Sequence, residues 1–184
     1  MPGIDAQGDD GLSAIERAVH RDEIGQLVYR YAAAIDRRDL DELAGLFAPD
    51  ADFGAAGRGP HGARVMFGAA LREIGMAVLL VANHLIDFDD PTHARGQVWC
   101  RGYIDDNREG FIEQMIQYRD HYVRVDDRWR FGGRRHLLWY GVATAEDPLG
   151  QPDADWPARQ VGRGSVPFHE ATWQAFWGDA PRGG

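Results

Sequence analysis

The chain has 184 residues, of which 44% are hydrophobic and 27% are charged. These values predict one folded domain with an apolar core, and they exclude a disordered chain and a disulfide-stapled miniprotein. The 29 acidic residues outnumber the 20 basic ones, and every basic residue is Arg. The resulting net charge of −9 argues against a nucleic-acid partner, and the lack of Lys excludes Schiff-base chemistry.

The single cysteine, Cys100, leaves no partner for an internal disulfide, which suits a reducing cytoplasm. No apolar run is long enough for a membrane-spanning helix, and the N-terminus lacks the pattern of a signal peptide. We therefore expect a cytoplasmic protein that has no membrane partner.

Helical patterns occupy the first part of the chain. Residues 1–12 are acidic and Gly-rich, and are expected to form a flexible arm. Ser13 and Glu16 form a capping box that predicts a helix running to about Ile35. Asp39 is predicted to cap a second helix that ends before Pro49. A short strand over 51–55, a glycine-rich loop and a third helix over 63–75 are predicted to follow.

Strand patterns dominate the second part. The alternation of apolar and polar residues predicts strands over 83–89, 94–105, 111–125 and 129–142, joined by short turns. Helices followed by an antiparallel meander indicate an α+β domain, here placed over residues 13–144. Residues 145–184 are predicted to form a tail that includes a short helix with three large aromatic residues, Trp173, Phe176 and Trp177.

Several separated motifs resemble the SnoaL-like family of the nuclear transport factor 2-like superfamily. They are LVYRYAAAIDRRDLDELAGLFAPDADF at 27–53, then NHLI, ARGQVWCRGYI and YRDHYVRVDDRWRFGGRR, in that order. The resemblance covers about residues 14–140. It implies a cone-shaped curved antiparallel sheet, in part mixed, wrapped around three N-terminal helices, with a pocket at the open end. Family members include polyketide cyclases, scytalone dehydratase, a hexachlorocyclohexane dehydrochlorinase and non-catalytic binders.

The resemblance also implies a catalytic dyad of Asp36 and His84. Asp36 is the first acid of the Asp-Arg-Arg-Asp run, and His84 opens the strand after the third helix. An Asp that accepts an imidazole N–H fixes the tautomer and raises the basicity of the other ring nitrogen. Each residue also has an ordinary structural explanation, because Asp36 can end its helix and His84 can be a half-buried strand residue.

Six further residues match pocket positions of the family. Arg134 would hold a leaving group or an enolate-like oxygen, or it could pair with a surface acid. Tyr31 stands where the dehydrochlorinase has a lysine, and it is also a core position on its helix. The remaining matches, for which core packing is the alternative explanation, are Phe53, Val98, Cys100 and Tyr118.

The function implied is that of a cofactor-independent lyase or isomerase. The Asp-His dyad would take a carbon-bound proton from a small, largely apolar substrate, leading to elimination, isomerisation or aldol-type cyclisation. The alternative is a binding or assembly module, such as one similar to the small subunit of a ring-hydroxylating dioxygenase. No metal motif is present, and the acidic run at 87–90 lacks the spacing of a calcium loop.

Two expectations concern assembly and the tail. Trp99, Tyr103 and Trp139 alternate on the predicted sheet, so we expect a homodimer or homotrimer that pairs through its outer face. The aromatic tail helix is expected to cover the pocket or an adjoining interface, or else to pack on the outer sheet.

Overall fold

A computed structural model describes residues 10–178 of the protein. Most of the arm predicted for residues 1–12 therefore lies outside the described residues. Its last part is not free in solution, because Asp10 is only 7% exposed and accepts hydrogen bonds from the Arg17 guanidinium. The prediction of a flexible arm is wrong for this residue, since an ion pair fastens it to the first helix.

The N-terminal helices begin close to where the capping residues place them. Helix α1 spans Ala14–Arg37, and the predicted capping box at Ser13 is present. Helix α2 spans Leu40–Gly45, with the Asp39 side chain accepting from the Glu42 N–H. Both starts are confirmed because side-chain oxygens bind backbone N–H groups that a helix leaves without internal partners.

The segment between α2 and the sheet differs from the prediction. Residues 51–55 form no strand; a 3-10 turn, η1, spans Gly54–Ala56 instead. Helix α3 spans Gly59–Ala70, so it begins four residues before the predicted start and includes Pro60 in its first turn. Proline suits that position because the first turn needs no N–H donor there.

The sheet has four antiparallel strands in the order β1-β2-β3-β4. Strands β2 (His93–Asp106), β3 (Gly110–Val125) and β4 (Arg128–Ala143) match the predicted ranges to within a residue or two. Strand β1 (Ile74–Asp90) begins nine residues earlier than predicted, within what was expected to be the third helix. The start was missed because this part of the strand is a continuous apolar run, MAVLLVA, without the alternation of apolar and polar residues that would indicate a strand.

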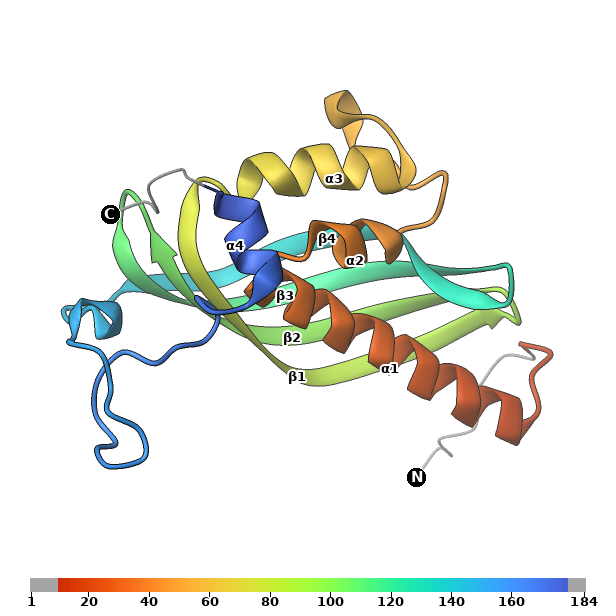
Figure 1. The fold of residues 1–184 in the computed structure, drawn as a ribbon. Helices are drawn as coiled ribbons and strands as arrows, with labels where there is room; N and C mark the ends of the chain where they lie inside the picture. Colours follow the sequence, from red (N-terminus) through yellow and green to blue (C-terminus); the bar gives the residue numbers. More distant parts are fainter. Residues whose placement is uncertain (1–9, 179–184) are drawn as a thin grey trace.

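The three N-terminal helices lie on one face of the curved sheet (Figure 1). The core between these layers contains Ile24, Val28, Val98, Cys100 and Phe131, each no more than 1% exposed. The architecture is therefore α+β, with helices first and a curved antiparallel sheet after them. Within residues 10–178, no helix is both long and apolar enough to span a membrane.

The described part of the tail contains a short 3-10 turn, η2, at Pro148–Gly150 and, at its end, helix α4, Ala171–Trp177. Helix α4 lies between the ends of α1 and α3 (Figure 1), where the Thr172 hydroxyl donates to the Arg37 carbonyl at 2.9 Å. The three aromatic side chains of α4 are each at least 93% buried. The tail helix therefore belongs to the core and does not pack on the outer sheet.

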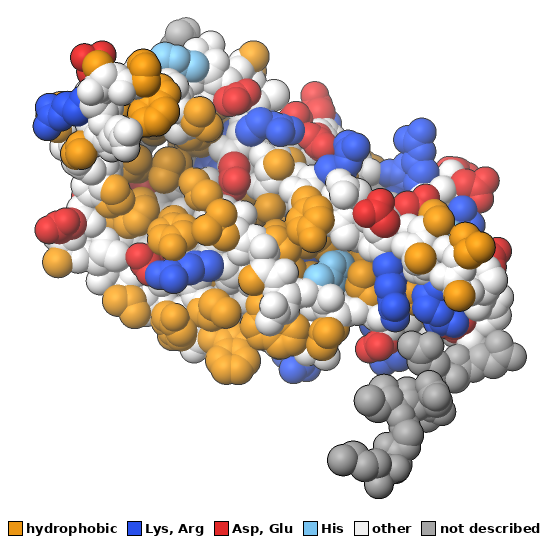
Figure 2. All heavy atoms as spheres, turned by 90° about the horizontal axis from the view of Figure 1, so that it is seen from below, with side chains coloured by type: hydrophobic (Ala, Val, Ile, Leu, Met, Phe, Trp, Pro, Cys, Tyr) orange, Lys and Arg blue, Asp and Glu red, His pale blue; other side chains and the backbone are white. Residues whose placement is uncertain are grey.

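Apolar residues are also present on the surface. Figure 2 shows hydrophobic side chains spread widely over the face seen from below, the side on which β1 is the outermost strand in Figure 1. On β1, Leu80 and Leu85 are 52% and 57% exposed. On the opposite edge strand β4, Trp139 and Tyr140 are 64% and 55% exposed.

Candidate active site

A cavity of about 440 Å³ opens between α1, α3 and the β3–β4 strands. Its wall is mainly aromatic. The rings meet edge to face, as those of Phe47 and Phe53 do, with their centroids 5.0 Å apart. The polar groups in its lining are few, as is usual for a small-molecule site. The aromatic members are Tyr31, Phe47, Phe53, Phe67 and Tyr118, and the charged or titratable side chains are Asp52, Arg134 and His136.

Arg134 is the central polar group of this cavity. Its guanidinium forms two hydrogen bonds with Asp120, from Nε at 2.8 Å and from Nη2 at 2.6 Å. The side chain of Arg134 is 5% exposed and that of Asp120 is fully buried. Burial by itself lowers the pKa of Arg134, but the hydrogen bonds and charge of Asp120 outweigh burial and raise it. Arg134 is therefore a permanent cation.

Three aromatic rings surround the Arg134 guanidinium, those of Tyr31, Tyr118 and Phe131, at 4.2–4.3 Å from its central carbon. These cation–π contacts use none of the guanidinium N–H groups, which stay available for hydrogen bonds in the plane of the group. Two of its nitrogens bind Asp120. Among residues 10–178, the third, Nη1, is buried and has no hydrogen-bond partner. An unpaired buried N–H of a cation favours a ligand oxygen or halide.

His136 stands at the mouth of the same cavity. It follows Arg134 by two residues on β4, and its ring lies 5.3 Å from that of Tyr118. Burial, and after it the charge of Arg134, lowers the pKa of His136. The imidazole is therefore neutral at physiological pH and can accept a proton. The structure places His136 in the lining of the cavity.

His84 lies in a different place. It lines an open groove of about 570 Å³ between α1 and β1, together with Arg21, Gly25 and Tyr29 of the helix. Its Nε2 is hydrogen-bonded to the Tyr122 hydroxyl at 3.0 Å. Burial lowers the pKa of His84 to about 4, against the opposing influence of Asp120.

Asp36 lies near the beginning of β1. Its Oδ1 accepts a hydrogen bond from the Leu79 N–H at 3.0 Å. Burial raises the pKa of this carboxyl to about 6, although the Leu79 hydrogen bond and the charges of Arg38 and Arg37 oppose the rise. Helix α1 contributes Gly25 to the groove that His84 lines, whereas Asp36 of the same helix binds the Leu79 N–H.

The expected contact between Asp36 and His84 is thus not formed. Eleven residues separate Gly25 from Asp36, which corresponds to roughly 16 Å along a helix axis. The two side chains have separate partners, and among the described residues no hydrogen bond or ion pair joins them. The prediction of a dyad is corrected here, because the helix crosses the strand with Asp36 opposite Leu79 instead of His84.

Four of the six predicted pocket residues line the cavity, namely Tyr31, Phe53, Tyr118 and Arg134. The other two, Val98 and Cys100, are completely buried in the core and are absent from the lining. Burial raises the pKa of the Cys100 thiol to about 11, so the thiol is neutral. For these two residues the alternative of core packing is the correct one.

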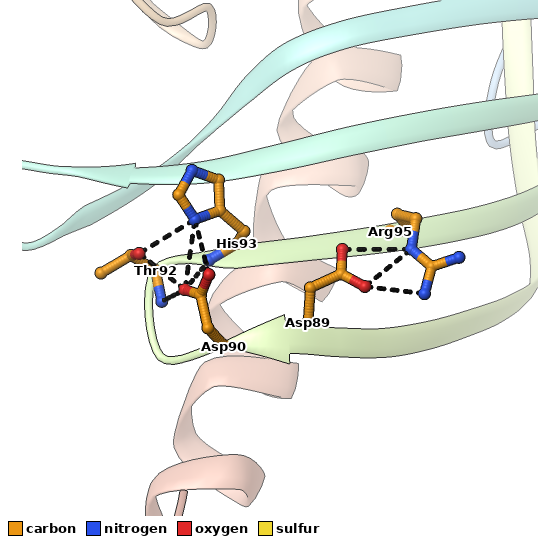
Figure 3. Close-up of polar contacts among 5 residues, drawn as sticks. All are labelled: Asp89, Asp90, Thr92, His93 and Arg95. Carbon is orange, nitrogen blue, oxygen red and sulfur yellow. Dashed lines mark hydrogen bonds and ion pairs between the residues drawn. The ribbon is translucent and has the colours of Figure 1, made fainter. Parts of the chain in front are cut away.

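The acidic run at 87–90 has a structural role at the turn between β1 and β2. Figure 3 shows Asp90 oriented toward Thr92 and His93, and Asp89 toward Arg95. The Asp90 carboxylate accepts from the backbone N–H groups of Thr92 and His93 at 2.6 and 2.9 Å. Hydrogen bonds from Thr92 lower the pKa of Asp90 to about 2. These side chains hold the turn between the two strands.

Several residues of the site were not predicted from the sequence. They are Asp120, Tyr122, Phe47, Phe67 and His136. One signal was available, since the Asp126-Asp127 turn brings Asp120 and Arg134 nearly opposite each other on neighbouring strands. The exact pairing depends on a bulge at Gly132, where the register shifts by one residue.

Solved structures with the same fold include hexachlorocyclohexane dehydrochlorinases. A hexachlorocyclohexane dehydrochlorinase of type 3 from Novosphingobium barchaimii has a TM-score of 0.66 and 20% identity, covering 72% of this chain and 95% of its own. A type 2 dehydrochlorinase has a TM-score of 0.65 and 21% identity, covering 72% and 94%. A proposed scytalone dehydratase from Novosphingobium aromaticivorans has a TM-score of 0.63 and 21% identity, covering 77% and 100%.

These similarities establish the fold, and the structural neighbours include lyase-type enzymes. No curated protein matches the chain in sequence. The model of a SnoaL-like domain matches residues 16–135, which is more than half of the chain and runs from the first turn of α1 to Arg135 of β4. The protein therefore belongs to the SnoaL-like family of the nuclear transport factor 2-like superfamily.

Proposed function

We propose that this protein is a lyase or isomerase that acts, without a cofactor, on a small and largely apolar cyclic substrate in the aromatic cavity. The observation that carries the proposal is the Arg134 cation, which lines the same cavity as a neutral His136 and whose buried Nη1 has no hydrogen-bond partner among the described residues. A preorganised cation beside a base is suited to proton abstraction next to a carbonyl group.

The proposed reaction has two steps. His136 takes a proton from the carbon beside the carbonyl; the C–H bond breaks, an N–H bond forms, and the electron pair moves to the oxygen. Arg134 Nη1–H stabilises this enolate oxygen. The enolate then expels a β-hydroxyl group: the C–O bond breaks, an α,β double bond forms, and the hydroxyl leaves as water with the proton from His136. If the substrate instead has a β,γ double bond, the dienolate takes that proton at its γ-carbon and the double bond moves to the α,β position. The first outcome is dehydration and the second is isomerisation.

His136 replaces His84 as the base in this proposal for a geometric reason. His84 is outside the lining of the aromatic cavity, and its Nε2 is already engaged with Tyr122. His136 faces the cavity from its mouth and is exposed to solvent, so its proton can exchange with water between turnovers.

A binding module without catalysis is the second candidate. It is favoured by the separation of Asp36 from His84, because the dyad that supports catalysis in the dehydratase-like pattern is not formed. The same cavity would then hold a ligand without changing it.

A carbon-acid exchange experiment separates the two candidates. The probe is 2-tetralone, a ketone fused to a benzene ring, incubated with the protein in D₂O and followed by proton NMR. We expect the protein to accelerate exchange at the carbons beside the carbonyl group beyond that caused by the same concentration of imidazole. His136→Gln should lower this rate about 100-fold, the usual scale for loss of a general base. Assays of chloride release from hexachlorocyclohexane and of water loss from scytalone extend the test.

The matched control is His169→Gln, which removes an exposed imidazole outside the cavity lining and should leave exchange unchanged. Binding of 2-tetralone without accelerated exchange, or equal exchange by the wild type and His136→Gln, would reject the catalytic proposal. Binding without exchange would support the second candidate.

A further inference from the structure

A buried chain of hydrogen bonds continues from Arg134 to the groove on the other side of α1. The Asp120 carboxylate, which holds Arg134, accepts a hydrogen bond from the Tyr122 hydroxyl at 2.7 Å. The same hydroxyl is 3.0 Å from Nε2 of His84. Three side chains thus connect the cation of the cavity with the open groove between α1 and β1.

The chemistry of the groups sets the direction of these bonds. An ionised carboxylate only accepts hydrogen bonds, so the Tyr122 hydroxyl uses its single proton toward Asp120. The contact with His84 then requires that Nε2 carries a hydrogen and donates it to the Tyr122 oxygen. His84 is therefore assigned the tautomer with hydrogen on Nε2, and its Nδ1 has the free lone pair.

Two local features of the sheet make room for this chain. The register between β1 and β2 shifts between Val81 and His84, so both residues point to the inner face despite being three positions apart. Tyr122 lies directly against Gly96 of β2, where an added Cβ would be 2.6 Å from Cε2 of the ring. A regular strand would direct His84 outward, and any larger residue at 96 would displace the phenol.

We propose that His84 and Tyr122 are positioning residues that hold Asp120, and through it Arg134, so that Nη1 stays free to bind a ligand. The Tyr122 hydroxyl binds the oxygen Oδ2 that also accepts from Arg134 Nη2, which fixes the plane of the carboxylate. A carboxylate free to rotate could bind the guanidinium through Nη1 and Nη2 instead, and Nη1 would be lost to the ligand. The role in ligand binding rests on the proposed function, but the positioning itself does not.

The test measures how firmly Arg134 is held, without any substrate. In ¹⁵N-labelled protein, the Nε–H of Arg134 is expected to exchange slowly with water because it is buried and bonded to Asp120. Arg134→Lys identifies its signal by removing it. Tyr122→Phe and His84→Leu should each accelerate the exchange roughly tenfold, the effect of losing one ordinary hydrogen bond.

Rescue and control variants separate positioning from simple stability. His84→Gln places an amide N–H close to the lost Nε2–H and should restore slow exchange, whereas Tyr29→Phe removes an exposed hydroxyl from the same groove and should change nothing. Unchanged exchange in His84→Leu, or the same acceleration in His84→Gln as in His84→Leu, would overturn the inference. The variants could change the exchange of the Arg134 Nε–H as expected although the protein is inactive toward 2-tetralone. That result would reject only the proposed reaction and would support the positioning roles of His84 and Tyr122.

Discussion

Replacing Asp36 with Asn is expected to stabilise the protein above pH 6. The Asp36 carboxyl is partly buried, and its hydrogen bond from Leu79 does not offset the loss of hydration. The side-chain oxygen of Asn can accept the same hydrogen bond without a charge. The substitution therefore removes the cost of burying the carboxylate and keeps the contact.

The magnitude follows from the pKa of Asp36, which rises from 3.8 to about 6. Each pKa unit corresponds to about 1.4 kcal/mol, so the full effect would be about 3 kcal/mol. Because the group is only partly buried, solvent screening is expected to reduce the gain to about 1–2 kcal/mol. For a domain of this size that gain raises Tm by about 2–8 °C.

The pH dependence has a definite sign. The folded protein binds the Asp36 proton more tightly than the unfolded chain, so the contribution of Asp36 to stability is greatest below pH 3.8. It falls as the pH rises to about 6 and is constant above that value. The advantage of Asp36→Asn should therefore grow between these pH values.

Urea unfolding at pH 4 and at pH 7.5 measures this advantage, with Asp22→Asn on the exposed face of α1 as the control. If Asp36→Asn is less stable than the wild type at pH 7.5, the carboxylate is stabilising and the reasoning from burial is wrong. An advantage of the same size at both pH values would also contradict it.

Two other outcomes are expected. Trp173→Ala should lower the free energy of unfolding by about 3–5 kcal/mol, because this side chain is only 1% exposed. The variant should still bind 2-tetralone, since α4 contributes no residue to the cavity lining. A loss of binding at unchanged Tm would instead make α4 a lid. Light scattering at micromolar concentration should give the mass of a dimer or trimer, and Trp139→Asp should shift it toward the monomer. A monomeric wild type would contradict that assembly.

The order of the elements and most of their boundaries could be predicted from the amino-acid sequence. The Ser13 capping box and the Asp39 cap mark the starts of α1 and α2 because their side-chain oxygens bind the next few backbone N–H groups. Short turns such as Asp126-Asp127 fix which strands are neighbours. These features depend on residues close in the chain, so they can be recognised without a structure.

The sequence also pointed to much of the cavity wall. Arg134, Tyr31 and Tyr118 were identified through their positions in a family pattern, and all three line the cavity. The same pattern could not separate lining from core, because Val98 and Cys100 face inward on β2 just as lining residues do. Alternation tells which face of a strand is apolar, but not how far from the cavity a residue lies along it.

Which polar side chains contact one another depends on how the elements pack in three dimensions. A bulge between Val81 and His84 turns His84 inward to Tyr122, and a second bulge at Gly132 sets Arg134 opposite Asp120. The crossing of α1 over β1 places Asp36 beside Leu79, far along the strand from His84. One extra residue in a strand reverses every side chain beyond it, and its position depends on packing against other elements. Local sequence patterns do not contain that information.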